Sequence, residues 1–139
     1  MPSLKNKKNE NDWVDQAIDR LVKEYGVVPP PWVPFENKHP YSLFWRMGAG
    51  ESHLMIFSRW WADRNLEETA RIAYFRRWPP PPRWLEWTIE ALWSIDPWNE
   101  EEDELDYAPY FERVAKLGFG TRADFEKDFN DPRWLASEP

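Results

Sequence analysis

Histidine is the residue type best suited to proton transfer near neutral pH, and this chain has two, His39 and His53. His53 ends a short segment, residues 46–53, in which glycines precede a predicted helix. Exposed N–H groups at a helix start can bind an anion. Arg46, Glu51 and His53 would then be the polar groups of an aromatic pocket for a flat ligand or a sugar. The structural alternative is a turn and a helix cap, because no P-loop lysine or dinucleotide-binding spacing accompanies the glycines.

The chain lacks the residue sets of common catalytic and metal sites. It contains no Cys, which excludes disulfides, a thiol nucleophile and Cys-ligated zinc or iron–sulfur clusters. Glu51 and His53 are two residues apart, so they diverge on a helix. No Glu-x-x-His pair and no Gly-x-Ser-x-Gly motif occurs. We therefore expect no catalytic residue, no bound metal and no cofactor, and the balance disfavours an enzyme without excluding one.

Aromatic side chains are unusually frequent and suggest a binding surface. They make up 17% of the chain, with 11 Trp, 8 Phe and 5 Tyr. Residues 32–47 carry several of them on a stretch with little helical periodicity. Trp, Tyr and Arg dominate binding hot spots, so Trp32, Trp45 and Arg46 are candidate contacts for a protein partner. The alternative is that these rings form a lid over the hydrophobic core.

Negative charge is concentrated in one short segment. The net charge is −7, and residues 96–106 contain seven acidic and no basic residues. The candidate partner contacts within it are Glu100, Glu101, Glu102, Asp103 and Glu104. Such a surface would attract a basic partner, as in acidic inhibitors of nucleases; the alternative is a solvated loop. Nucleic-acid binding is disfavoured, because no basic footprint is present.

Proline separates two apolar segments in the middle of the chain. Pro79–Pro82 follow an aromatic and basic stretch and precede Arg83-Trp84. Four consecutive prolines form a stiff spacer, which favours a rigid corner between two helices. The alternatives are a ligand for an aromatic-groove domain of the SH3 type, or an exposed Trp and Arg surface.

Hydrophobic periodicity of about 3.6 residues predicts a series of short helices. The predicted helices cover residues 11 or 12–25, 51–64, 66–78, 83–94, 109–117 and 121–129. Asn65 with Glu68, and Thr121 with Asp124, resemble N-terminal capping boxes. The Pro-rich residues 27–35 are expected to be extended and to pack against the domain.

These elements predict an all-α fold. We expect a single compact domain, residues 11–139, of five or six short helices with Pro-rich extended connections and an aromatic-dominated core. A flexible polar tail, residues 1–10, precedes it. No apolar stretch approaches the length of a membrane helix and residues 1–10 lack a signal-peptide core, so a soluble cytoplasmic protein is expected.

The function that fits best is a soluble protein-interaction module without catalytic activity, such as an adaptor, an inhibitor or an immunity-type protein. Its partner would be another protein, one with a basic surface in the more specific version. The alternative is a small-molecule binder or small enzyme that uses an aromatic pocket near residues 46–53.

Overall fold

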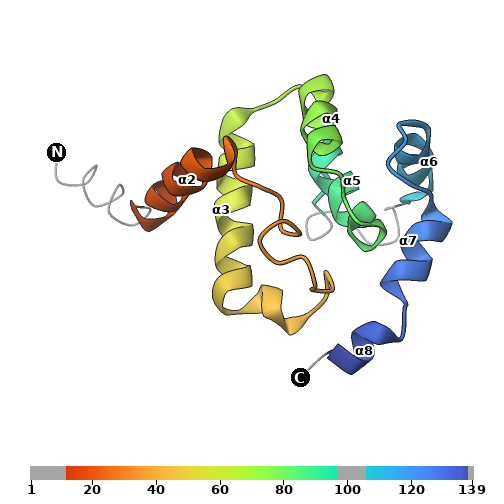
Figure 1. Cartoon of the computed structure of the whole chain (residues 1–139). Helices are drawn as coiled ribbons and strands as arrows, with labels where there is room; N and C mark the ends of the chain where they lie inside the picture. Colours follow the sequence, from red (N-terminus) through yellow and green to blue (C-terminus); the bar gives the residue numbers. More distant parts are fainter. Residues whose placement is uncertain (1–11, 97–105, 138–139) are drawn as a thin grey trace. The chain divides into compact units, whose positions relative to one another are not determined.

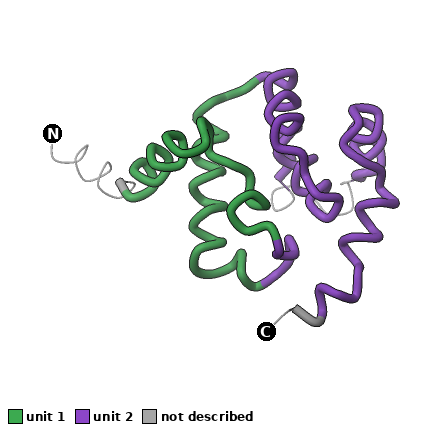
Figure 2. Tube along the Cα trace, viewed as in Figure 1, with its two compact units in different colours: residues 1–36, 43–66 green, residues 37–42, 67–139 purple. Residues whose placement is uncertain are grey.

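The computed structural model describes residues 12–96 and 106–137. Within these ranges the chain forms α-helices and short 3₁₀ turns and no β-strand (Figure 1), which confirms the predicted all-α class. The chain divides into two compact units (Figure 2): unit 1 contains residues up to 36 and residues 43–66, and unit 2 contains residues 37–42 and those from 67 onward. The single domain over residues 11–139 stays a prediction. The tail, residues 1–10, lies outside the described residues.

Unit 1 contains the helices α2, Asp12–Tyr25, and α3, Gly48–Arg64, with a 3₁₀ turn η1, Leu43–Arg46. Helix α2 has the predicted bounds, and Gly26 ends it with φ of +83°. Helix α3 begins three residues before the predicted start at residue 51. The earlier start depends on Gly50, because a Cβ there would overlap the carbonyl oxygen and ring of Phe44.

Aromatic rings from α3 form much of the core of unit 1. Phe57 and Trp61 stack with their ring centroids 5.3 Å apart, and Trp60 packs beside both. The buried apolar residues of unit 1 are Val14, Ala17, Val28, Trp32, Trp45, Ile56, Phe57, Trp60 and Trp61. This confirms that aromatic side chains dominate the core here, as the composition predicted.

The Pro-rich segment after α2 packs inside unit 1. Val28 and Pro29–Pro31 are fully buried, as the apolar character of the segment predicted. The extended conformation ends earlier than expected, however. The N–H of Val33 donates to the Pro30 carbonyl at 3.1 Å, so the chain turns there. Proline contributes no N–H, but its carbonyl remains an acceptor, which permits this turn.

Asn65 ends a helix where the sequence suggested that it begins one. Its φ of +47° is left-handed, and its N–H donates to the Ala62 carbonyl at 3.2 Å. The next helix, α4, covers Glu68–Arg77 and has Glu67 in place of Asn65 at its N-cap. The predicted capping box of Asn65 and Glu68 is therefore wrong. Asn tolerates the left-handed conformation, which suits it to both ends of a helix.

Unit 2 is built around the helix after the proline corner. The four prolines end α4, and Pro82–Trp84 form a 3₁₀ turn, η2, that leads into α5, Leu85–Trp93. The fully buried side chains of this segment are Trp84, Leu85, Thr88, Ile89 and Leu92. This helix therefore lies in the core of unit 2.

Among the described residues, unit 2 has three further helices: α6, Ala108–Lys116, α7, Arg122–Phe129, and α8, Arg133–Ser137. The predicted capping box of α7 is confirmed, because Thr121 and Asp124 exchange hydrogen bonds of 3.1 and 3.3 Å. Helix α8 was not predicted. Asp131 accepts the N–H of Arg133 at 3.0 Å, so the segment that follows α7 starts α8.

Candidate binding pocket

Two of the candidate partner contacts lie inside unit 1. Trp32 is 6% exposed and Trp45 is 5% exposed. The ring of Phe35 packs edge-on against Trp45 with 5.9 Å between centroids, and Phe44 does so at 5.0 Å. Both indoles are core side chains, whereas Arg46 is exposed. Partner binding by Arg46 stays a prediction.

The three residues suggested for a ligand pocket point in different directions. His53 is buried, and its Nε2–H donates to the Pro29 carbonyl at 2.9 Å. Burial lowers the pKa of His53 more than this hydrogen bond raises it, so the ring is neutral near pH 7. Arg46 and Glu51 are exposed instead. A ligand site formed by these residues stays a prediction.

The acidic candidates cannot be placed. Glu100, Glu101, Glu102, Asp103 and Glu104 lie outside the described residues.

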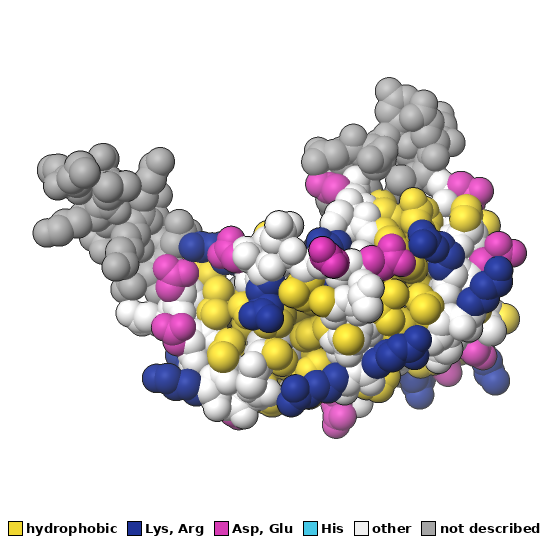
Figure 3. Space-filling view, turned by 90° about the horizontal axis from the view of Figure 1, so that it is seen from above, with side chains coloured by type: hydrophobic (Ala, Val, Ile, Leu, Met, Phe, Trp, Pro, Cys, Tyr) yellow, Lys and Arg dark blue, Asp and Glu magenta, His cyan; other side chains and the backbone are white. Residues whose placement is uncertain are grey.

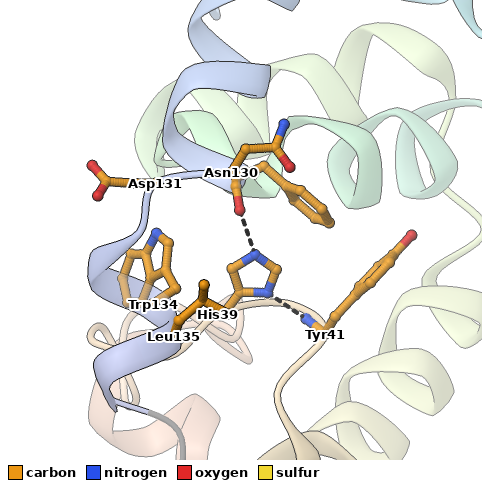
Figure 4. Close-up of a pocket in the computed structure, with 7 residues that line it drawn as sticks. His39, Tyr41, Asn130, Asp131, Trp134 and Leu135 are labelled. Carbon is orange, nitrogen blue, oxygen red and sulfur yellow. Dashed lines mark hydrogen bonds between the residues drawn. The ribbon is translucent and has the colours of Figure 1, made fainter.

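A surface pocket lies in unit 2, where two distant parts of the sequence meet, residues 39–41 and residues 129–135 (Figure 4). Its volume is about 440 Å³, within the range of small-ligand and side-chain pockets. The residues that line it are His39, Tyr41, Phe129, Asn130, Asp131, Trp134 and Leu135. Three of the seven are large aromatic residues, so the pocket favours an apolar or aromatic group.

His39 joins the segment before η1 to the end of α7. Its Nε2–H donates to the Phe129 carbonyl at 2.8 Å, and its Nδ1 accepts the N–H of Tyr41 at 3.0 Å (Figure 4). The ring lies 4.4 Å from that of Phe129, centroid to centroid. Both ring nitrogens are thus occupied by the backbone. His39 therefore acts as a structural wall of the pocket, with no nitrogen directed at a ligand.

Asp128 holds the pocket wall formed by α7 and α8. Its carboxylate accepts the backbone N–H of Arg83 at 3.0 Å and lies 3.5 Å from the Arg83 guanidinium. It also accepts from Arg133 at 2.8 Å. The Asp128 carbonyl accepts the Nε1–H of Trp134 at 2.8 Å. The charge-assisted bonds from the two arginines hold the Asp128 carboxylate, and the bond to the Asp128 carbonyl fixes the direction of the Trp134 ring.

Arg83 connects this wall to the opposite one. Its Nε–H donates to the carbonyl of Lys38 at 3.2 Å, and Lys38 directly precedes His39 in the chain. Its guanidinium lies 4.6 Å from the centroid of the Trp134 ring. Although it carries a charge, Arg83 is only 7% exposed. One buried side chain therefore contacts every segment that lines the pocket.

Two phenol–carboxyl pairs lie along one face of α5. Tyr41 donates to Glu86 at 3.1 Å, and Tyr107 donates to Glu90 at 2.7 Å. The pKa of Glu90 is raised to about 7, mainly by burial; the bond from Tyr107 lowers it, and the charges of Glu86 and Asp96 add to the increase. Burial also raises the pKa of Tyr107, with Glu90 adding to the effect. Two carboxyl groups thus lie on this face, each accepting a hydrogen bond from a phenol.

The described residues offer no sign of other common site types. No group of three His, Cys, Asp or Glu residues among them could hold a metal ion. No described helix is both long and apolar enough to cross a membrane. On the face in Figure 3, hydrophobic side chains lie among side chains of both charges.

Sequence patterns did not indicate this pocket. They single out His39 as a titratable residue, but not Tyr41, Phe129 or Trp134. The contact between His39 and Phe129 spans 90 residues of sequence. The local sequence signal for part of the pocket is Asp131-Pro132, because Asp at an N-cap followed by Pro is typical of a helix start and so indicates α8.

Comparison with family models, with curated proteins and with solved structures finds no match for this chain. Its function must therefore be inferred from the geometry of its own residues.

Proposed function

We propose that this chain is a non-catalytic protein-interaction module that binds its partner at the pocket of unit 2. The observation that carries the proposal is the combination of aromatic walls with exposed apolar residues at the edge. Leu135 is 81% exposed and Tyr41 is 64% exposed, and both line the pocket. Large exposed apolar side chains beside a concave surface are typical of a contact site.

The geometry of His39 supports binding more than proton transfer. A general base must direct a nitrogen at its substrate, and both nitrogens of His39 bond to the backbone. The network of Asp128, Arg83 and Trp134 supports a rigid wall, which reduces the entropy lost when a partner binds. A partner side chain of apolar or aromatic character fits this pocket.

The net charge supports a partner with a basic surface. The chain carries −7 in total, and opposite charge on the partner would raise the association rate. In this more specific version the acidic segment attracts the partner and the pocket of unit 2 anchors it. An inhibitor or immunity-type protein for a basic toxin is one such case.

The test compares two exposed apolar residues. Leu135→Glu places a charge at the edge of the pocket, whereas Met55→Glu does so on α3 in unit 1, where Met55 is 50% exposed. The partner captured from native lysate by the wild-type chain should bind Leu135→Glu at least about 30-fold more weakly, as for a hot-spot residue. Met55→Glu should bind it as the wild type does.

Two results would contradict the proposal. One is that the wild-type chain captures no stoichiometric partner at any of several salt concentrations. The other is that the two variants bind a captured partner equally well. Circular dichroism of both variants checks that the helices are retained.

A further inference from the structure

Unit 2 contains an internal example of how it binds a guanidinium group. The guanidinium of Arg83 lies over the Trp134 ring, 4.6 Å from its centroid, and 3.5 Å from the Asp128 carboxylate. An aromatic face and a carboxylate beside it thus contact one guanidinium together. This combination suits arginine, whose flat group stacks through its face and donates hydrogen bonds from its edge.

At the edge of the pocket, Tyr41 provides an aromatic ring and Glu86 a carboxylate, the two kinds of group that contact the Arg83 guanidinium. The Tyr41 hydroxyl donates to the Glu86 carboxylate at 3.1 Å, so ring and carboxylate are adjacent. The contacts of Tyr41 with His39 and Phe129 are T-shaped, with centroids 6.1 and 4.9 Å away. Within the described part of the chain, no Arg or Lys side chain lies over this ring, which stays 64% exposed.

The charges around Tyr41 favour a cation. Burial raises the pKa of Tyr41 to about 12, and the negative charges of Glu86 and Glu90 contribute to the increase. Asp131 adds a carboxylate to the pocket lining, at 4.0 Å from Arg133. Arg83 and Arg133, which hold the pocket wall, are both paired with Asp128.

We propose that Tyr41 and Glu86 form a binding site for an arginine side chain of a basic protein partner. The guanidinium stacks on the Tyr41 ring and donates hydrogen bonds to the Glu86 carboxylate, as Arg83 does with Trp134 and Asp128. The proposal rests on the proposed function, since the same partner fills the pocket beside this site. It assigns that partner an arginine next to an apolar side chain.

The experiment uses the full chain and three short peptides. Acetyl-Gly-Arg-Gly-amide, its lysine analogue and its citrulline analogue are titrated into the ¹⁵N-labelled protein and followed by NMR. Citrulline has the shape of arginine without its charge. The arginine peptide should shift the amide signals of Tyr41 and Glu86 saturably. The citrulline peptide should bind about tenfold more weakly, because its bond to Glu86 is no longer charge-assisted.

Two variants measure separately what the Tyr41 ring and the Glu86 carboxylate contribute to binding of the arginine peptide. Glu86→Gln keeps an acceptor for Tyr41 and should weaken binding of the arginine peptide about tenfold. Tyr41→Leu keeps an apolar side chain without the aromatic face and should weaken it about fivefold. Glu112→Gln, an exposed side chain on α6, is the matched control and should change nothing. Equal binding of the arginine peptide and either analogue, or shifts only elsewhere, would overturn the assignment.

The two proposals fail in different ways. If Leu135→Glu abolishes partner capture while the arginine peptide leaves Tyr41 and Glu86 unshifted, the interaction module stands and the arginine site is wrong. If the arginine peptide binds at Tyr41 and Glu86 while no partner is captured, the site stands and the interaction module is wrong.

Discussion

At the scale of single residues, Asp128 is the acceptor on which the pocket depends. Its side chain is 13% exposed and binds two arginines, one buried and one exposed. A buried ion pair contributes little compared with an apolar pair of the same size, but loss of one partner leaves a charge without compensation. The free energy lost when Arg83 is replaced therefore depends on how far Arg133 alone can compensate the Asp128 charge.

Replacement of Arg83 should destabilise unit 2. Arg83→Met removes the guanidinium contacts with Asp128 and the Lys38 carbonyl and leaves only the backbone N–H bond to Asp128, and we expect a loss of about 3 kcal/mol in the free energy of unfolding. Arg83→Lys keeps the charge without the planar group, so a loss of about 1–2 kcal/mol is expected. Urea denaturation measures both.

Arg122→Met is the control for this prediction. Arg122 makes an exposed ion pair with Glu126 on α7, and its loss should cost less than about 1 kcal/mol. If Arg83→Met is no more destabilising than this control, the role given to Arg83 in holding the pocket is wrong.

Glu90 should make stability depend on pH. Its pKa in the folded chain, about 7, exceeds the ordinary value of 4.5, so the folded state binds the proton more tightly than the unfolded state does. The stabilisation is complete below about pH 4.5 and declines as the pH rises to about 7. Above that value it is lost, and no further change from Glu90 is expected.

The measurement for Glu90 compares urea midpoints at pH 5 and pH 8. The urea midpoint of the wild type should be lower at pH 8 than at pH 5. Glu90→Gln should reduce this fall because Gln cannot ionise. Glu112→Gln, on the exposed face of α6, should leave the fall unchanged. An identical pH dependence in wild type and Glu90→Gln would disprove the raised pKa.

At the scale of elements, helix boundaries depend on single contacts that local patterns do not reveal. Thr121 and Asp124 formed the predicted capping box because its bonds lie within four consecutive residues. Asn65 did not, because the left-handed end of α3 competes for the same residue. The start of α3 at Gly48 also depends on a contact outside the helix, between Gly50 and Phe44.

Gly50→Ala tests that contact through the sign of the change in the free energy of unfolding. Helix propensity alone predicts that Ala in place of Gly stabilises a helix by about 1 kcal/mol. The new Cβ would instead meet the backbone oxygen of Phe44, which cannot move away by rotation. Overpacking costs about 1–3 kcal/mol, so we expect net destabilisation in urea denaturation.

Gly48→Ala provides the comparison for Gly50. A Cβ at Gly48 meets open space, but the φ of +71° costs an L-residue about 1–2 kcal/mol. Its effect should therefore come from backbone strain alone and leave the packing of Phe44 intact. A stabilised Gly50→Ala variant would show that the close approach to Phe44 is absent.

At the scale of the whole molecule, charge should govern the rate of association. Replacement of Glu100–Glu104 by Gln and Asn removes five of the chain's negative charges. For a basic partner we expect a slower association rate and a weaker dependence on salt, with little change in dissociation. Surface plasmon resonance at several salt concentrations measures this. Unchanged association would eliminate the acidic segment as a docking surface.

The fold was more predictable from the sequence than the candidate site was. Helical periodicity located α2 and α5 because amphipathic spacing is a local property. The burial of Trp32 and Trp45 depends on tertiary packing, for Trp45 against Phe35, so the sequence left the direction of both indoles open. The pocket required His39 to meet Phe129, a long-range contact that no local pattern encodes.

The residues that line the pocket come from two stretches of sequence that lie far apart in the chain. Residues 37–42 belong to unit 2, although the residues on both sides of them belong to unit 1. A fragment that starts at residue 67 would include α4 to α8 but would lack His39 and Tyr41. It would keep Trp134 and Asp128 and lose the facing wall. The binding surface proposed here is thus a property of the intact polypeptide, and neither half of the sequence encodes it alone.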